Sequence, residues 1–381
     1  MKICMVMDGW TPIYGGGQAH IWEVSKRLVK NHGCKVDILT RKLKDENKKK
    51  FVKKEFYYDN KLKIIRVGPT TKFWNLFGRV LSLFSMIKPL VKNNYDIIHA
   101  HAYLSAFPTK IAKVWSKKPL VFTIHGTGLD VISDMNKNRF TSFVKTFFEK
   151  FILFKLKYDQ EISVDSSVLK YKNRNKNLLI IPNGVDVKSY DKIIVSKSKK
   201  FKIIFVGRIH PQKGLEYLIK AMPKIISKNP LVEVHIIGTG ELEKELKELS
   251  KQLNVEKNVF FRGKIFSDAL IKEYKSSHLF VLPSLYEGQP LTLLEAWAAK
   301  LPVVVTNVGG NKDFVVNEQN GYIIKVKDID LLAATINKAI RNENLKKIGE
   351  EGYRIVNEKY DWDRITERIF LVYKNIIKSK N

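Results

Sequence analysis

Cysteine is scarce in this sequence, since only Cys4 and Cys34 occur among 381 residues. Both lie in or beside apolar, strand-like runs, so we expect reduced and buried packing residues rather than a disulfide framework. Cysteine and histidine form no cluster with the spacing of a metal site, and we expect no bound metal. These absences are typical of a cytoplasmic protein and exclude the small disulfide-rich and zinc-finger classes.

Long uninterrupted hydrophobic runs are also absent. The two longest apolar stretches, residues 73–91 and 140–154, are interrupted by basic side chains: Arg79, Lys88, Lys145 and Lys150. Because a helix that spans a bilayer needs about 20 nearly uninterrupted apolar residues, we expect neither stretch to cross a membrane. Residues 1–3 lead directly into a strand pattern, so we expect no signal peptide here.

Acidic residues are few relative to basic ones, with 38 Asp and Glu against 68 Lys and Arg, for a net charge of +30. Residues 1–200 contain 39 basic and 16 acidic residues, or +23, whereas residues 201–381 contain 29 and 22, or +7. An acidic partner of the first half would explain this asymmetry: nucleic acid, an anionic bilayer or a phosphate-bearing acceptor. A lysine-rich composition with solvated surfaces explains it equally well.

The composition is that of a globular protein, 44% hydrophobic and 28% charged, and the length favours two domains. Short Val- and Ile-rich runs alternate with amphipathic helical stretches, a pattern typical of parallel sheets covered by helices on both faces. The fold class we expect is α/β, with two Rossmann-like, doubly wound domains. The expected strands are residues 2–7, 35–40, 62–67, 96–100, 119–125, 161–164 and 178–181, followed by 202–207, 232–237, 258–261, 278–282, 303–306 and 321–324.

The strand pattern restarts after the polar, lysine-rich run 196–200, which we interpret as an interdomain linker. We therefore expect a first domain at 1–195 and a second at 196–362, with the last helix, 363–381, packing back onto the first. Each domain begins with a strand, a glycine-containing loop and a helix N-terminus, which together can bind an anion.

The strongest local signal is the segment L-P-S-L-Y-E-G-Q-P-L-T-L-L-E-A-W-A-A at 282–299, in which a strand, a loop with Glu287 and a helix with Glu295 follow one another. A loop carboxylate can accept hydrogen bonds from sugar hydroxyls, and a carboxylate set back on the helix can bind both hydroxyls of a ribose. A single glutamate here would be explained by its interaction with the helix dipole, but the pair favours a binding site. The amides expected to point toward a diphosphate are those of Gly288, Leu291 and Thr292.

Arg208 and Lys213 lie just beyond another expected strand, in the segment G-R-I-H-P-Q-K-G at 207–214. Two cations at this place can neutralise a leaving diphosphate, and the arginine can bind it in a bidentate manner. They would stabilise the negative charge that develops as a glycosidic bond breaks, a task that a metal ion performs elsewhere. Ordinary surface cations are the alternative interpretation.

With these motifs in this order, the sequence resembles glycosyltransferase family 4, whose members have the GT-B fold. The resemblance covers nearly the whole chain, and the combination of motifs makes it specific. The matching motifs are Gly15-Gly16-Gly17, D-I-I-H-A-H at 96–101, T-I-H-G at 123–126, I-P-N-G-V-D at 181–186, Gly207-Arg208 with Lys213-Gly214, and the pair Glu287 and Glu295 with seven residues between them.

The resemblance implies two domains that face each other across a cleft, the first on the acceptor side and the second binding a nucleotide-sugar donor. It implies retaining transfer of a hexose from a nucleoside diphosphate sugar, with neither a metal nor another cofactor. The implied catalytic residues are His125 and Glu287, of which Glu287 binds the hexose hydroxyls. The implied donor-binding residues are Gly16, Gly17, Arg208, Lys213, Gly263, Gly288, Leu291, Thr292 and Glu295, with Glu295 on the ribose, Arg208 and Lys213 on the diphosphate, and Gly263 at the base.

His125 ends the apolar run P-L-V-F-T-I-H, and the resemblance implies that it contacts the sugar near the C6 hydroxyl. The family often has an acidic residue directly after this histidine, whereas Gly126 stands here and Asp130 follows at a different spacing. His99 and His101 end another strand, and we interpret them as structural or acceptor-side residues. His20 is interpreted as an ordinary packing or surface residue, as are His32, His235 and His278.

An aromatic and basic stretch at 140–157 contains six phenylalanines and four lysines. It fits a helix that lies in a bilayer interface, or a core-facing helix before the strand at 161–164. Together with residues 73–91 and the charge of the first half, it leads us to expect an anionic or membrane-borne acceptor, a glycan or glycolipid. We expect a cytoplasmic protein that binds peripherally to the inner face of an anionic membrane.

Two other classes of function fit part of the sequence. Sugar-nucleotide epimerases and phosphorylases share the GT-B fold, but the former lack this glutamate pair with its Arg and Lys partners, and the latter need a longer chain and a cofactor lysine. A nucleic-acid-binding module is suggested by the charge alone, without an RNP-type, zinc or helix-turn-helix signature. We therefore do not expect nucleic acid as a partner.

Overall fold

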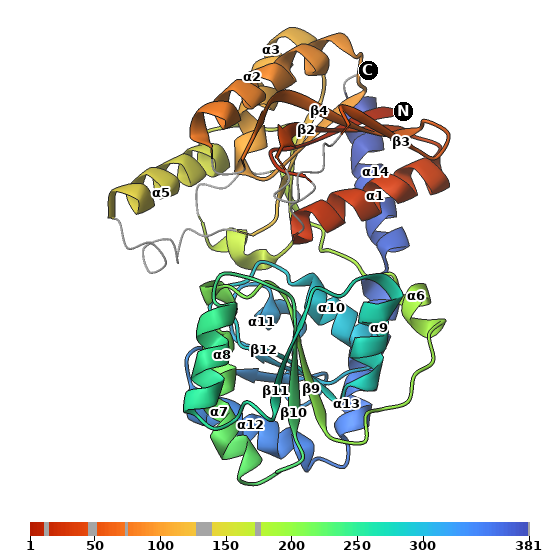
Figure 1. Ribbon diagram of the computed structural model, residues 1–381. Coiled ribbons are helices and arrows are strands. Elements are labelled where there is room, and N and C mark those ends of the chain that lie inside the picture. Colours follow the sequence, from red (N-terminus) through yellow and green to blue (C-terminus); the bar gives the residue numbers. More distant parts are fainter. Residues whose placement is uncertain (11–14, 45–51, 73–74, 127–138, 172–176, 380–381) are drawn as a thin grey trace. The chain divides into compact units, whose positions relative to one another are not determined.

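The computed structural model divides the chain into two compact units, unit 1 with residues Met1–Asn183 and Trp362–Asn381, and unit 2 with Gly184–Asp361 (Figure 1). It describes residues 1–10, 15–44, 52–72, 75–126, 139–171 and 177–379, without the side chains of 139–145 and 154. Each unit is one sheet with its own helices, so each is described separately.

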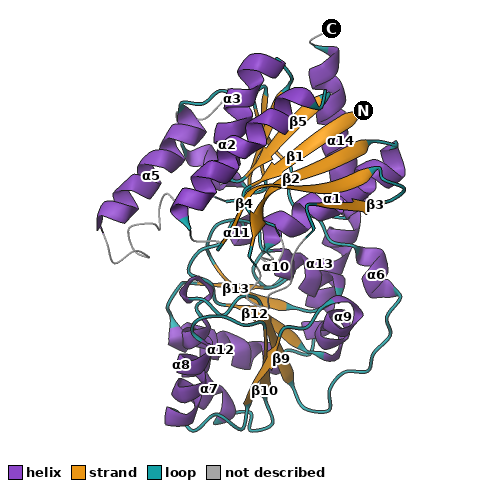
Figure 2. Cartoon of the chain, turned by 45° about the horizontal axis from the view of Figure 1, so that its top comes forward, coloured by secondary structure: helices purple, strands orange, loops and turns teal. Residues whose placement is uncertain are grey.

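Unit 1 is built on an eight-stranded sheet in the order β3-β4-β2-β1-β5-β6-β7-β8. All neighbouring strands are parallel except β3 and β4, which are antiparallel. Figure 2 shows β1 between β2 and β5, where the strand order changes direction. The strands are β1 Lys2–Met7, β2 Lys35–Leu43, β3 Lys54–Tyr57, β4 Leu62–Thr71, β5 Ile97–His101, β6 Leu120–Ile124, β7 Gln160–Ser163 and β8 Leu178–Ile180.

Helices cover both faces of this sheet, with α2, α3 and α5 on one side and α1 and α14 on the other (Figure 1). Helix α1 buries Ile21, Val24 and Leu28, the apolar face expected from the sequence, and ends at Gly33, whose left-handed φ of 64° suits glycine. Helix α14, the last in the chain, packs on α1, and Asp363 accepts a hydrogen bond from Arg27 Nε at 2.9 Å. The helices are α1 Gly16–His32, α2 Leu76–Lys92, α3 Ala106–Ser116, α5 Arg139–Phe154 and α14 Trp362–Lys378, with 3-10 turns at Tyr103–Ser105 and Ser166–Lys170.

Unit 2 has a six-stranded, wholly parallel sheet in the order β11-β10-β9-β12-β13-β14. This is the 3-2-1-4-5-6 order of a doubly wound Rossmann sheet, and it reverses direction between β9 and β12. Continuous apolar runs form the strands because both faces are buried. The strands are β9 Lys202–Val206, β10 Glu233–Ile237, β11 Val259–Gly263, β12 Leu279–Leu282, β13 Val303–Thr306 and β14 Tyr322–Ile324.

The helices of unit 2 form a layer on each face of its sheet, with α7, α8 and α12 on one side and α9 and α13 on the other (Figure 1). The helices are α6 Val187–Asp191, α7 Leu215–Ile226, α8 Glu243–Gln252, α9 Ser267–Ser276, α10 Leu291–Ala298, α11 Asn311–Phe314, α12 Ile329–Ile340 and α13 Leu345–Lys359, with a 3-10 turn at Pro211–Lys213. The expected fold class, α/β with two Rossmann-like doubly wound domains, is therefore what the structure shows.

The structure differs from the expected domain boundary at 195/196, because the chain enters unit 2 at Gly184. Val187 and Tyr190 are buried in the core of unit 2, so this segment cannot belong to unit 1. The lysine-rich run 196–200 is not a linker but a surface segment of unit 2, fastened by the bond from Ser198 N to Ser276 O at 2.9 Å.

The strand β3 was not expected, whereas every other strand was. Residues Lys54–Tyr57 form an edge strand, and three of the four are exposed. Such a strand needs no apolar run, which is the pattern that identified the others.

The two cysteines are free and buried, as expected. No helix within the described parts of the chain is both long and apolar enough to span a membrane.

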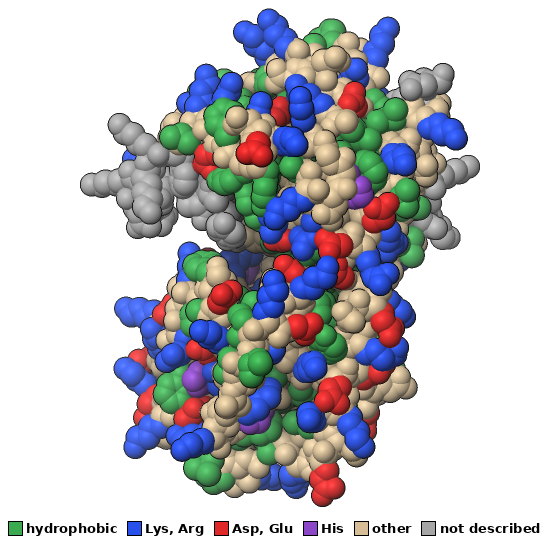
Figure 3. All heavy atoms as spheres, turned by 90° about the vertical axis from the view of Figure 1, so that its right-hand side faces the viewer, with side chains coloured by type: hydrophobic (Ala, Val, Ile, Leu, Met, Phe, Trp, Pro, Cys, Tyr) green, Lys and Arg blue, Asp and Glu red, His purple; other side chains and the backbone are tan. Residues whose placement is uncertain are grey.

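The positive charge of the chain is concentrated in unit 1. This unit has 39 basic and 16 acidic residues, or +23, and unit 2 has 29 and 22, or +7. On the face drawn in Figure 3, Lys and Arg side chains are scattered, with Asp and Glu side chains among them. On this face the basic side chains therefore form no single patch.

Candidate active site

The two loops that carry Arg208, Lys213 and Glu287 leave the same edge of the unit 2 sheet. Strands β9 and β12 are neighbours, and their carboxyl ends, Val206 and Leu282, open into loops 207–214 and 283–290. The sheet reverses its strand order between these two strands, which is where doubly wound sheets bind ligands. The topology therefore brings together two motifs that lie far apart in the sequence.

Lys213 and Glu287 are in direct contact at this edge. Lys213 Nζ lies 2.5 Å from Glu287 Oε1, and Ser284 Oγ donates a hydrogen bond to the same oxygen at 2.6 Å. Glu287 is only 5% exposed and Ser284 is fully buried. Both recorded donors reach Oε1, so they fix the orientation of the carboxylate through one of its two oxygens.

Close backbone packing holds the two loops together. Leu285 N donates to Gln212 O at 2.8 Å, and Gln212 Nε2 donates to Tyr286 O at 2.9 Å. Gly309, with a φ of 48°, lies against the Glu287 carbonyl so closely that a Cβ would come within 1.7 Å of that oxygen. Glycine is required at position 309 because no side chain fits between this loop, which follows β13, and the loop that carries Glu287.

The first turn of α10 lies directly after Glu287, as expected for Gly288, Leu291 and Thr292. Pro290 precedes the helix, and its side chain provides no cap. The first amides of a helix have no partner within the helix, and the dipole there favours an anion. Gly288 O accepts from Gly310 N at 2.7 Å, so the turn before the helix is tied to the loop after β13.

Glu295 is held by a residue that the sequence did not suggest. Tyr274 in α9 donates its hydroxyl to Glu295 Oε2 at 2.8 Å. Burial raises the pKa of Glu295, and the bond from Tyr274 opposes this by lowering it. Glu295 in α10 is thus anchored to α9 by this hydrogen bond. No contact of Glu295 with Lys213 or Glu287 is recorded.

Arg208 and Gly263 are the remaining expected donor-binding residues of unit 2. Arg208 is exposed in the loop after β9, and no ion pair of its guanidinium is recorded within the described residues. Gly263 ends β11 with a φ of 66°, and its carbonyl accepts from Gly238 N at 2.7 Å. Both residues lie at the carboxyl edge of the sheet, where an anionic ligand can reach Arg208.

In unit 1 the expected residues also lie where strands end. His125 follows β6 and Gly17 is in the first turn of α1 after β1. A Cβ on Gly17 would lie 3.6 Å from His125 Cδ2 and 3.0 Å from Met7 Cε, so the glycine allows the helix to approach the imidazole. Gly16 is exposed at the start of the same helix. The structure therefore brings Gly17 and His125 together.

Three further histidines surround His125. Nδ1 of His101 lies 3.1 Å from Nε2 of His125, and the ring of His20 meets that of His125 edge-on at 5.0 Å. The ring of His99 lies 4.0 Å from that of His101, tilted by 31°, and Nε2 of His99 lies 2.6 Å from Thr123 Oγ1. The interpretation of His20 as an ordinary packing or surface residue was therefore incomplete: it is buried, but within this cluster, with its Nδ1 2.8 Å from Asn183 Oδ1.

The histidine cluster is neutral. Burial lowers the pKa of His20 to about 4. Burial, followed by repulsion from neighbouring imidazoles, lowers the pKa of His99, His101 and His125 well below the usual value. At neutral pH each ring therefore carries one N–H and one bare nitrogen, and the cluster supplies hydrogen-bonding groups rather than charge.

Metal-ligand groups of three or more His, Cys, Asp or Glu side chains do not occur in the part of the chain that the structure describes. Two Asp-x-Asp tripeptides are present, at 328–330 and 361–363. In the first, Asp328 caps α12 and Asp330 pairs with Lys224, and in the second Asp363 pairs with Arg27. Asp130 lies outside the described residues, as do the side chains of Phe140, Phe143, Lys145 and Phe154.

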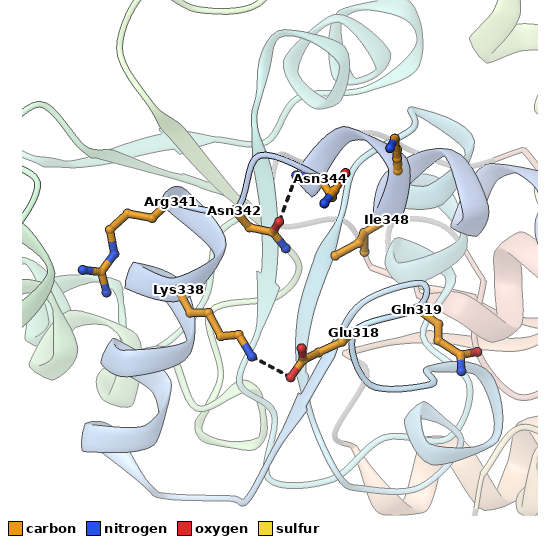
Figure 4. A pocket seen from close by; sticks show the side chains of 8 residues that line it. Glu318, Gln319, Lys338, Arg341, Asn342, Asn344 and Ile348 are labelled. Atoms are coloured by element: carbon orange, nitrogen blue, oxygen red, sulfur yellow. Dashed lines mark hydrogen bonds and ion pairs between the residues drawn. The ribbon is translucent and has the colours of Figure 1, made fainter.

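A separate cavity of about 640 Å³ lies elsewhere in unit 2 and contains none of the expected site residues (Figure 4). Its lining comes from the turn before β14 and from the facing ends of α12 and α13, at the amino-terminal edge of the sheet. Figure 4 shows Lys338 paired with Glu318 across it, at 2.7 Å. The carboxyl edge, with its paired buried glutamate, remains the candidate active site.

Comparisons with known proteins identify the family of the chain. Residues 14–189 match the model of Glycosyltransferase Family 4, and residues 186–355 match that of Glycosyl transferases group 1. An uncharacterized glycosyltransferase of Methanocaldococcus jannaschii is 30% identical over 397 aligned residues, which cover 98% of each chain. The UDP-Gal:alpha-D-GlcNAc-diphosphoundecaprenol alpha-1,3-galactosyltransferase of Escherichia coli is 30% identical over 324 residues, 79% of this chain and 82% of the relative.

Among solved structures, sucrose-phosphate synthase of Thermosynechococcus elongatus superposes with a TM-score of 0.86 at 21% identity, covering 99% of both chains. This likeness concerns the fold, which is of the GT-B type. The protein is thus a sugar-transferring enzyme built on two Rossmann-like units. The chain belongs to glycosyltransferase family 4, as its motifs indicated.

Proposed function

We propose that this glycosyltransferase transfers a hexose from a nucleoside diphosphate sugar, with retention at the anomeric carbon and without a metal ion. The observation that carries the proposal is the buried contact between Lys213 and Glu287 at the point where the unit 2 sheet reverses direction. A carboxylate held through one oxygen can accept sugar hydroxyls with the other, and the lysine beside it can neutralise a phosphate. UDP is the nucleotide we favour, because the relative from Escherichia coli is described as using UDP-Gal.

In this proposal, cationic side chains stabilise the leaving diphosphate, a task that a metal ion performs in other enzymes. Negative charge develops on the diphosphate as the glycosidic bond breaks, and Lys213, the exposed Arg208 and the amides at the start of α10 can stabilise it. In the two Asp-x-Asp tripeptides, Asp328 caps a helix, and Asp330 and Asp363 are in ion pairs. These engagements support a reaction without a metal ion.

A thermal-shift screen with UDP-, GDP- and ADP-sugars tests the donor assignment. A ligand present at about 100 times its dissociation constant should stabilise the fold by about 2.7 kcal/mol. The matching transfer assay, with and without EDTA, should give equal rates, and NMR should show an α-linked product from an α-linked donor. Loss of activity in EDTA that magnesium or manganese restores, or an inverted linkage, would refute these two parts of the proposal.

For the acceptor we propose a phosphate-bearing, membrane-borne glycan or glycolipid. Unit 1 carries +23 of the +30 net charge, and a diphosphate-linked lipid is the acceptor named for the relative from Escherichia coli. Attraction between a basic surface and anionic lipid contributes about 1 kcal/mol per Lys or Arg near the surface and weakens with salt.

Exposed apolar side chains on unit 1 support peripheral binding to such a membrane. Helix α5 buries Ile152 and Leu153 but exposes three phenylalanines, so the core-facing interpretation describes only one of its sides. Helix α2 exposes Phe77 to 76%, and α3, which packs on α2, meets α5 through Phe107 and Phe148. Among the side chains that the structure describes, the exposed large apolar residues of the three helices are Leu76, Phe77, Val80, Leu81, Phe84, Val114, Trp115, Phe147, Phe148 and Phe151.

Co-sedimentation with vesicles tests the membrane proposal. At low salt the protein should bind vesicles with anionic phospholipid and not neutral ones, and reversing the charge of Lys150, Lys155 and Lys157 should release it while nucleotide binding stays intact. Reversal of three exposed lysines of unit 2, Lys244, Lys257 and Lys272, is the matched control. Equal binding to both vesicle types, or none to either, would contradict the proposal.

A further inference from the structure

A line of contacts runs from a buried sulfur atom to the imidazole of His125. Met5 Sδ in β1 lies 3.4 Å from Nε2 of His101 in β5, and Nδ1 of His101 lies 3.1 Å from Nε2 of His125. Met5 and His101 are fully buried, whereas His125 is partly exposed. The exposed end of the line is therefore the imidazole expected to contact substrate.

The sulfur decides which nitrogen of each ring carries the proton. A thioether sulfur accepts hydrogen bonds and cannot donate one, so the contact with Met5 is favourable only if Nε2 of His101 is protonated. A neutral His101 with its proton on Nε2 has a bare Nδ1, which can only accept. His125 must then donate from its own Nε2, and its Nδ1 is left bare.

We propose that Met5 and His101 are positioning residues that hold His125 in the Nε2–H form, so that Nδ1 of His125 accepts a hydrogen bond from a substrate hydroxyl. The role at the substrate rests on the proposed function, whereas the proton positions do not. A histidine held in this way selects a group that donates, and a fluorine atom in place of that hydroxyl would not be accepted.

Two features of the cluster support this arrangement. Burial keeps the pKa of His101 and His125 well below the usual value, so each ring carries only one proton. In each ring, one nitrogen is therefore a donor and the other an acceptor. The rings of His101 and His125 stack at 5.3 Å with 24° between their planes, and His20 packs edge-on against His125, which restricts rotation of the ring.

NMR of the protein labelled with ¹⁵N-histidine tests the proton positions without any substrate. In long-range ¹H–¹⁵N spectra, protonated and bare imidazole nitrogens resonate in separate ranges, and His101→Asn and His125→Asn variants assign the signals. We expect both His101 and His125 to be protonated on Nε2 and bare on Nδ1 at neutral pH. Protonation of either ring on Nδ1 would overturn the proposal.

Matched variants at position 101 test the effect on the reaction. Asparagine places its amide oxygen near the position of Nδ1 and can accept from His125, whereas glutamine reaches toward Met5 and leucine offers no acceptor. We expect kcat/KM to fall about tenfold in His101→Leu and His101→Gln and to recover in His101→Asn, with the affinity for free nucleotide unchanged in all three. Equal losses in the asparagine and leucine variants, at equal thermal stability, would overturn the positioning role.

The two proposals fail in distinguishable ways. If no nucleotide sugar is bound or turned over by the wild-type protein, the proposed function is wrong, yet the NMR spectrum still decides the proton positions. If transfer occurs and a donor with fluorine at the contacted hydroxyl reacts as well as the parent sugar, the acceptor role of His125 is wrong while the glycosyltransferase assignment stands.

Discussion

Removing the hydroxyl of Ser284 should damage sugar recognition selectively. Ser284 is fully buried just after β12, and its Oγ donates to Glu287 Oε1 at 2.6 Å. Nothing in the sequence singles it out, because a serine at a strand end is an ordinary loop residue. In the structure it is one of two recorded donors that orient the carboxylate of Glu287.

The expected magnitude follows from these contacts. A hydrogen bond to a charged group contributes about 1.5 to 3 kcal/mol. In Ser284→Ala, Lys213 still holds the same oxygen at 2.5 Å, so we expect the lower end of this range. A loss of about 1.5 kcal/mol corresponds to roughly a tenfold decrease in kcat/KM for the sugar donor. Binding of free nucleotide should be unchanged, because Glu287 is proposed to contact only the sugar.

The assay compares kcat/KM for the sugar donor with the dissociation constant of free nucleotide measured by calorimetry. Ser277→Ala is a matched control, since Ser277 is an equally buried serine at the opposite end of β12 and donates to Glu273 O. If Ser277→Ala lowers kcat/KM as much as Ser284→Ala, the effect is one of general packing. Weakened binding of free nucleotide in Ser284→Ala would likewise refute the reasoning.

Further outcomes are expected from the same structure. Glu295→Ala should weaken binding of the free nucleoside diphosphate, whereas Glu287→Ala should weaken the sugar donor and spare the nucleotide; calorimetry that shows normal nucleotide binding by Glu295→Ala would disprove the ribose assignment. The folded chain keeps His20 neutral because its pKa is lowered from 6.5 to about 4, while the unfolded chain binds a proton near pH 6.5. This contribution to the free energy of unfolding is therefore present above pH 6.5 and is lost as the pH falls toward 4. The loss amounts to up to about 3 kcal/mol. Denaturant titrations at several pH values should therefore show a weaker pH dependence for His20→Gln than for the wild type.

Most of the fold could be predicted from the sequence because its strands are buried on both faces. In runs such as Lys202–Val206 and Val303–Thr306 every residue is buried, and all but one residue of each run are apolar. The edge strand Lys54–Tyr57 lacks this signal because water covers much of it. Composition also misplaced the domain boundary, since a run of lysines is equally typical of a linker and of a surface loop whose backbone is hydrogen-bonded.

The sequence indicated candidate site residues, but not the partners that the structure gives them. Glu287 and Lys213 are 74 residues apart, and their contact exists only because β9 and β12 are neighbours in the sheet. Tyr274 holds Glu295 from a different helix, and no spacing in the sequence indicates that pair. Motifs identify residue types at strand ends, whereas pairings across a sheet require the strand order.

The strand order changes direction in each sheet, and the side chains at these two places differ in chemistry. In unit 2 the strands next to the reversal point lead to a buried ion pair, with the exposed Arg208 in the same loop as Lys213. In unit 1 the corresponding strands, β1 and β5, supply Met5 and His101, which are uncharged. We propose that the cations of unit 2 neutralise the leaving diphosphate, because a neutral imidazole cluster cannot balance that charge. Unit 1 has charged side chains directly after β1, but Asp8 pairs there with both Arg41 and Arg79. In unit 2, by contrast, no ion pair of Arg208 is recorded within the described residues, so the proposed division of roles rests on this exposed guanidinium.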